Sequence, residues 1–146
     1  MLKVETIYTQ PEEDKILVVS WFDYDPFMKL HFERYFFNII DLINRKEIKK
    51  LVLDCSCRRH NPSVSDFKDI FELFLSGLST TRLEKMARIC PPDLVASTNY
   101  NRLLERMTNE LDLTFELRSF KHAQDAYCWV KEENSLPEKA PLRKQA

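Results

Sequence analysis

The sequence predicts a single α/β domain on a five-stranded mixed sheet, with its elements in the order ββαβαβαβα. From Lys15 to Val130, short apolar runs alternate with longer amphipathic ones. The run 51–55 lies between two helix-like segments and is mostly apolar, which is typical of a buried parallel strand. The chain has one glycine, so it carries none of the glycine-rich loops that bind nucleotide phosphates.

The chain is expected to begin with a β-hairpin. Residues 2–9 alternate weakly between apolar and polar, residues 10–14 are a polar turn, and residues 16–22 are apolar almost throughout. The second strand therefore belongs inside the sheet. Right-handed crossovers then place the last four strands parallel, with the first strand antiparallel at an edge.

The first helix is predicted to open at Asp25 and Pro26, because aspartate caps free amide groups and proline suits the first helical position. It should end between residues 44 and 47. Its broad apolar face consists of Met28, Phe32, Tyr35, Phe36, Ile39, Ile40, Leu42 and Ile43. Leu30 and Phe37 project away from this face. They are either an exposed strip for a second subunit or a flank covered by a neighbouring helix.

The third strand is predicted at residues 50–55 and is followed by the clearest helix of the chain. Phe67, Ile70, Phe71, Phe74, Leu75 and Leu78 recur at helical spacing. Ser63 and Asp66 stand at capping-box spacing before them. Gly77 falls near the end, where a left-handed residue often terminates a helix.

The remaining elements follow the same alternation. Residues 85–90 are predicted as the fourth strand, stopped by Pro91 and Pro92, and residues 114–120 as the fifth. The helix between them carries Tyr100, Leu103, Leu104, Met107 and Leu111 at helical spacing, and the last helix, 121–130, turns Ala126, Trp129 and Val130 inward. Residues 1–132 form the predicted domain, and 133–146 a mobile tail without periodicity.

Composition excludes several classes of partner. The chain has 22 basic and 23 acidic residues, and no cluster of lysine and arginine, so no nucleic-acid partner is predicted. No apolar run approaches the roughly 18 residues of a transmembrane helix. The four cysteines lie in or beside apolar runs, which favours reduced thiols in the cytoplasm.

The element order, with Lys-Leu-Val-Leu-Asp at 50–54, resembles the STAS superfamily of domains that resemble anti-sigma-factor antagonists. The ending Phe-Lys-His-Ala-Gln-Asp-Ala-Tyr-Cys-Trp-Val at 120–130 is similar to the closing segment of its SpoIIAA-like branch. The resemblance implies a non-enzymatic domain that binds partner proteins or small ligands. It also implies a phosphorylated serine or threonine at the start of the second helix. Here no glycine follows Ser63 or Ser65, unlike in the phosphorylated members.

The candidate site for an acidic partner or anion lies between the third strand and the second helix. It consists of Arg58, Arg59, His60, Asn61, Ser63 and Ser65. These residues follow the carboxyl end of a strand, the edge at which open α/β sheets bind ligands, and they adjoin a helix N-terminus. The alternative is a solvated basic loop followed by a serine that only caps the helix.

A second cluster contains Cys55, Cys57 and His60, with Cys90 on the neighbouring strand. Three thiols and an imidazole are suitable zinc ligands. The spacing is not that of common zinc motifs, however, and buried cysteine often serves as a small apolar residue. No metal site and no cofactor are therefore predicted.

The sequence favours a non-catalytic regulatory or protein-interaction module, with a protein partner or a second copy of the chain as its target. One alternative is a carrier of a small apolar molecule or lipid, roofed by the first helix. A thiol-dependent enzyme using Cys57 or Cys90 with His60 is the third class, although the common enzyme motifs are absent.

Overall fold

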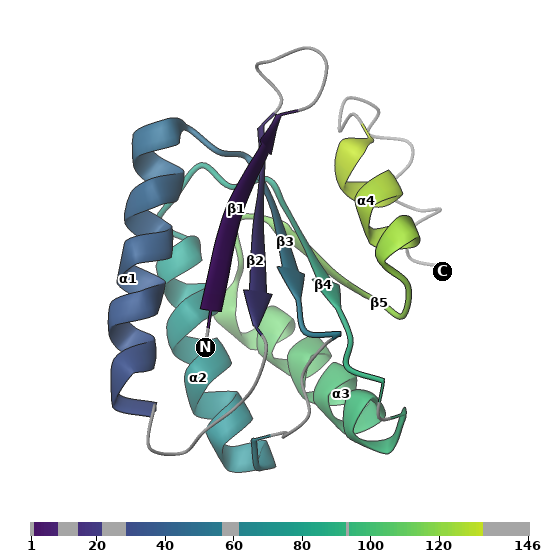
Figure 1. Cartoon of the computed structure of the whole chain (residues 1–146). Helices are drawn as coiled ribbons and strands as arrows, with labels where there is room; N and C mark the ends of the chain where they lie inside the picture. The colour runs from purple at the N-terminus through teal and green to yellow at the C-terminus, as the bar shows by residue number, and fades with distance from the viewer. Residues whose placement is uncertain (1, 9–14, 22–28, 57–61, 93, 133–146) are drawn as a thin grey trace.

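A computed structural model describes residues 2–8, 15–21, 29–56, 62–92 and 94–132 (Figure 1). Its elements are β1 (Leu2–Tyr8), β2 (Lys15–Trp21), α1 (Lys29–Lys46), β3 (Lys50–Asp54), α2 (Val64–Leu78), β4 (Lys85–Ile89), α3 (Leu94–Leu111), β5 (Glu116–Phe120) and α4 (Ala123–Lys131). The α/β class and the predicted order of elements are confirmed. The predicted opening of the first helix at residues 25–26 and the tail at 133–146 lie outside the described residues.

The sheet has its strands in the order β1-β2-β3-β4-β5, so each strand lies beside its neighbours in sequence. Strands β2 to β5 are parallel, and β1 pairs antiparallel with β2. Helices α1, α2 and α3 connect successive parallel strands and cover one face, whereas α4 covers the other (Figure 1). Because all four parallel strands point the same way, their carboxyl ends meet at one edge of the sheet.

Aromatic rings fill the space beneath α1 and α2. Trp21 stacks on Phe71 at a centroid distance of 6.0 Å and contacts Phe32 at 4.9 Å, and Phe36 stacks on Phe74 at 4.3 Å. These five side chains are 3% exposed or less. The predicted apolar stripes of both helices therefore meet each other and the sheet. This aromatic packing stabilises the face of the sheet that the three helices cover.

The opposite face of the sheet has a smaller core beneath α4. Ala126, Trp129 and Val130 are buried there, as predicted, against residues of β2, β3 and β4. The Trp129 indole also contacts the Phe120 ring at a centroid distance of 5.7 Å. The sheet is thus covered on both faces, which explains why the residues of β3 and β4 are nearly all buried.

Gly77 does not terminate α2, contrary to the prediction from sequence. It has no positive φ and lies within the helix, where an added Cβ would collide with the Ile40 side chain of α1. The left-handed residues that follow helices are instead Glu47 after α1 (φ 54°) and Asp112 after α3 (φ 53°). The glycine serves close packing between helices, because a missing side chain lets α1 and α2 approach.

Candidate functional site

The described part of the predicted partner site is the first turn of α2. Ser63 is the N-cap: its Oγ accepts a hydrogen bond from the Asp66 amide at 3.1 Å, and its carbonyl accepts one from the Phe67 amide at 2.9 Å. The interpretation of Ser63 as a helix cap is therefore confirmed. Arg58, Arg59, His60 and Asn61 lie outside the described residues.

The side chains that follow the cap face solvent. Ser63 and Ser65 are both exposed, and Val64 between them is 54% exposed. Exposure of the apolar Val64 side chain to water is unfavourable. A partner that covered this side chain would therefore gain binding free energy from its burial. This turn combines two hydroxyl groups, one apolar contact and the amide groups of a helix N-terminus at the carboxyl edge of the sheet.

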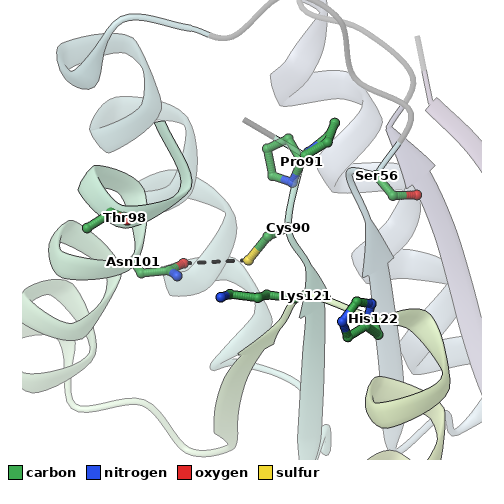
Figure 2. Close-up of a pocket in the computed structure, with 8 residues that line it drawn as sticks. Ser56, Cys90, Pro91, Thr98, Asn101, Lys121 and His122 are labelled. Atoms are coloured by element: carbon green, nitrogen blue, oxygen red, sulfur yellow. Dashed lines mark hydrogen bonds between the residues drawn. The ribbon is translucent and has the colours of Figure 1, made fainter. Parts of the chain in front are cut away.

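The same edge of the sheet contains a cavity of about 400 Å³ between the ends of three strands and α3 (Figure 2). Its polar walls come from Ser56 after β3, from Thr98 and Asn101 of α3, and from Lys121 and His122 after β5. Cys90, which follows β4 and is buried, is also part of the cavity wall. None of its described lining residues is a carboxylate. The cavity thus offers hydrogen-bond donors and positive charge to a ligand.

Arg88 lies behind this wall and is fully buried in β4. Its Nη1 donates to Asn101 Oδ1 at 2.8 Å, to Cys90 Sγ at 3.3 Å and to Ser119 Oγ at 3.3 Å. Its guanidinium carbon lies 5.6 Å from the centroid of the Phe67 ring. Nε and Nη2 are buried without a hydrogen-bond partner, and no described carboxylate pairs with this charge. Among the described residues, this permanently charged guanidinium therefore has only uncharged hydrogen-bond partners in the core.

Asn101 connects this buried charge to the cavity. Because guanidinium groups only donate, the Asn101 amide must turn its oxygen toward Arg88. The same oxygen accepts from the Cys90 thiol at 3.7 Å. The amide nitrogen of Asn101 is then directed away from Arg88, and Figure 2 shows the Lys121 side chain extending toward Asn101. Asn101 and Lys121 both line the cavity.

Among the described residues, no cysteine is hydrogen-bonded to a histidine as a thiol-dependent enzyme would require. Cys90 is hydrogen-bonded to Arg88 and Asn101, and Cys55 is buried, while Cys57 and His60 fall outside the described residues. Among the described side chains, no three of histidine, cysteine, aspartate or glutamate gather as metal ligands would. No helix within the described ranges is long and apolar enough to cross a membrane.

Phe37 on α1 is 69% exposed, which favours the exposed strip over a flank covered by a neighbouring helix. The backbone of Leu30 belongs to the same helix, but its side chain lies outside the described residues. Beneath α1, the stacked aromatic rings occupy the space in which the carrier alternative requires a ligand. The described residues therefore favour a surface function for this helix.

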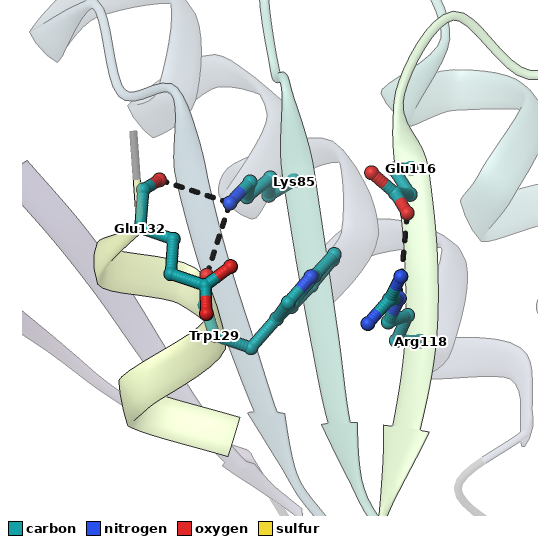
Figure 3. A network of polar contacts seen from close by, with 5 residues as sticks. All are labelled: Lys85, Glu116, Arg118, Trp129 and Glu132. Carbon is teal, nitrogen blue, oxygen red and sulfur yellow. Dashed lines mark hydrogen bonds and ion pairs between the residues drawn. The ribbon is translucent and has the colours of Figure 1, made fainter. Parts of the chain in front are cut away.

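A polar network fixes α4 at the opposite end of β4 (Figure 3). Lys85 is 2% exposed, and its Nζ donates to the carbonyl oxygens of Trp129 at 3.0 Å and Glu132 at 2.9 Å. The Trp129 ring lies between Lys85 Nζ, 4.9 Å from its centroid, and the Arg118 guanidinium, at 5.2 Å. Arg118 also pairs with Glu116 at 3.3 Å. These contacts satisfy the carboxyl end of the helix and are structural.

The sequence analysis missed the cavity and the burial of Arg88 and Lys85. The available signal was a charged residue at an inward position of an apolar strand: Arg88 stands between Ala87 and Ile89, and Lys85 begins the same strand. The cavity residues Asn101, Lys121 and His122 carry no local motif. They meet because β4 and β5 end, and α3 begins, at the same edge of the sheet.

No family model and no curated protein matches this sequence. Solved structures do match. An uncharacterized protein of the DUF3478 family from Shewanella loihica, described as having a SpoIIAA-like fold, superposes with a TM-score of 0.54 and 15% identity over 88% of this chain and 93% of the other. An anti-sigma factor antagonist from Mycobacterium paratuberculosis matches with a TM-score of 0.50 and 15% identity over 90% of this chain and 96% of the other. The chain has the STAS, SpoIIAA-like fold.

Proposed function

We propose that this chain is a non-catalytic regulatory module that binds a partner protein through the carboxyl edge of its sheet, at the first turn of α2. The exposed sequence Ser63-Val64-Ser65 carries the proposal, because it presents an apolar side chain between two hydroxyl groups at a helix N-terminus. Arg58, Arg59, His60 and Asn61 precede this turn in sequence and belong to the proposed surface. The fold shared with an anti-sigma factor antagonist supports a regulatory role.

A positively charged loop beside a helix N-terminus suits an acidic or phosphorylated segment of the partner. Phosphorylation of Ser63 or Ser65 would add negative charge to that surface and oppose the same partner. In addition, phosphate on Ser63 would change the group that accepts from the Asp66 amide. Modification of this turn would therefore regulate binding. A reducing compartment such as the cytoplasm fits the three described cysteines, all of which are free.

The test is affinity capture from native lysate, followed by binding measurements with the purified partner. Val64→Glu should abolish capture, since it replaces the exposed apolar contact with a charge. Leu73→Glu is the matched control, because Leu73 is 48% exposed on the same helix, more than two turns from the proposed surface. Equal capture by both variants would contradict the assignment of this turn. Circular dichroism of each variant establishes that it is folded.

A second copy of the chain is a further candidate partner, through α1. The observation that favours it is Phe37, a large apolar side chain that is 69% exposed in the middle of an 18-residue helix. Leu30, seven residues earlier in the sequence, is proposed to extend the same strip. A dimer through this strip would leave the carboxyl edge of the sheet open to a regulatory partner.

A further inference from the structure

We propose that the cavity between β4, β5 and α3 binds a small phosphate monoester, with the buried charge of Arg88 as its electrostatic anchor. The proposal does not depend on the protein partner proposed above, because it concerns a different part of the edge and a different class of ligand. It also does not use the first turn of α2. Its evidence is one buried guanidinium that no carboxylate among the described residues neutralises, and one cavity rich in donors.

The first step concerns charge. Arg88 is fully buried, and its side-chain acceptors among the described residues are all uncharged: Asn101, Cys90 and Ser119. Burying a charge without an opposite charge is unfavourable, and the penalty falls when a counter-ion binds nearby. Asn101 and Cys90 line the cavity and hydrogen-bond directly to the guanidinium. An anion in the cavity would thus lie behind a single layer of side chains from Arg88.

The second step concerns the donors that would hold the anion. Lys121 lines the cavity and adds a positive charge to its wall (Figure 2). The Asn101 oxygen accepts from Arg88, so the amide nitrogen is directed away from that guanidinium. Ser56, Thr98 and His122 provide further groups that can donate to oxygen. Among the described lining residues no carboxylate competes with these donors. Two positive charges and several donors match a dianionic phosphate better than a singly charged carboxylate.

The third step concerns size. A cavity of about 400 Å³ falls within the range of small-molecule sites and exceeds the volume of a phosphate group alone. Pro91 and Pro92 line the rest of the wall with apolar surface. The remaining space therefore suits the organic part of a small phosphorylated molecule. Its position at the carboxyl ends of parallel strands is where open α/β sheets bind ligands.

The experiment measures binding of inorganic phosphate and of glycerol phosphate by calorimetry and by amide chemical shifts, at constant ionic strength. Both probes should bind the wild type, with glycerol phosphate the tighter one, and shift the amide signals of Asn101, Lys121 and His122. Lys121→Ala should weaken binding roughly tenfold to a hundredfold, because one charge-assisted contact is lost. Lys131→Ala, which removes an exposed lysine outside the cavity, should bind like the wild type.

Asn101→Asp is the decisive variant. It places a carboxylate of the same shape 2.8 Å from Arg88 Nη1, so the buried charge gains a permanent partner. The variant should melt at a higher temperature than the wild type and should lose phosphate binding. Retained binding in Asn101→Asp, or equal affinity of Lys121→Ala and the wild type, would overturn the proposal. So would no binding of either probe at 10 mM, or weaker binding of glycerol phosphate than of inorganic phosphate. If Asn101→Asp does not fold, Lys121→Ala and its control decide the question, since Lys121 is exposed.

Discussion

Replacement of Lys85 by methionine tests whether the buried lysine holds α4 on the sheet. Methionine keeps an unbranched side chain, one atom shorter than that of lysine, but cannot donate to the carbonyl oxygens of Trp129 and Glu132, which accept from Nζ at 3.0 and 2.9 Å. Each charge-assisted hydrogen bond contributes about 1.5–3 kcal/mol. The variant no longer buries an ammonium group, which offsets part of the loss. We expect the free energy of unfolding to fall by about 2–4 kcal/mol.

Urea unfolding followed by tryptophan fluorescence and far-ultraviolet circular dichroism measures this change. A loss of 2–4 kcal/mol would lower the urea midpoint by about 1–2 M at a typical slope of about 2 kcal/mol per M. Lys131→Met is the matched control, because Lys131 is exposed in the last turn of α4. This substitution should change the free energy of unfolding by less than about 0.5 kcal/mol. A Lys85→Met variant as stable as the wild type would refute the reasoning. Desolvation of the ammonium group would then outweigh its two hydrogen bonds.

Two further predictions concern the surface turns and helices. Ser63→Ala should destabilise the fold by about 0.5–2 kcal/mol in the same urea assay, because the Asp66 amide loses its acceptor. Ser65→Ala should not destabilise it. Equal effects of the two substitutions would contradict the capping role of Ser63. Leu30→Glu combined with Phe37→Glu should convert a dimer into a folded monomer in sedimentation experiments. A monomeric wild type would remove the dimer proposal, and an unfolded double variant would show that these residues belong to the core.

The order of elements could be predicted because the apolar period changes at each junction. Phe67, Phe71 and Phe74 recur at helical spacing, whereas residues 51–55 are a short, nearly continuous apolar run. A run this short between helices is typical of a strand buried on both faces, and β3 is the central strand of the sheet. The cap at Ser63 was equally predictable, because its signal is contained in four consecutive residues.

The role of Gly77 could not be predicted from its neighbours in sequence. A glycine near the end of a helical pattern has two physical uses, a left-handed backbone or a close approach of another chain segment. Only the position of Ile40 on α1, 37 residues earlier in the sequence, decides between them. The residues with left-handed backbone conformation are instead Glu47 and Asp112, although both tolerate that conformation less well than glycine does.

The cavity was missed for a related reason, and the same reason connects it to the proposed ligand. An arginine in an apolar strand is visible in the sequence, but its counter-charge is not, because the partner of a buried charge comes from another element. Here the elements that surround Arg88 bring Asn101, Cys90 and Ser119, which are all uncharged. Folding alone thus leaves this charge without an anionic partner among the described residues. If Arg88 served packing alone, methionine could replace it without loss of stability or binding. If Arg88 anchors a ligand, its positive charge is needed to attract an anion from solution.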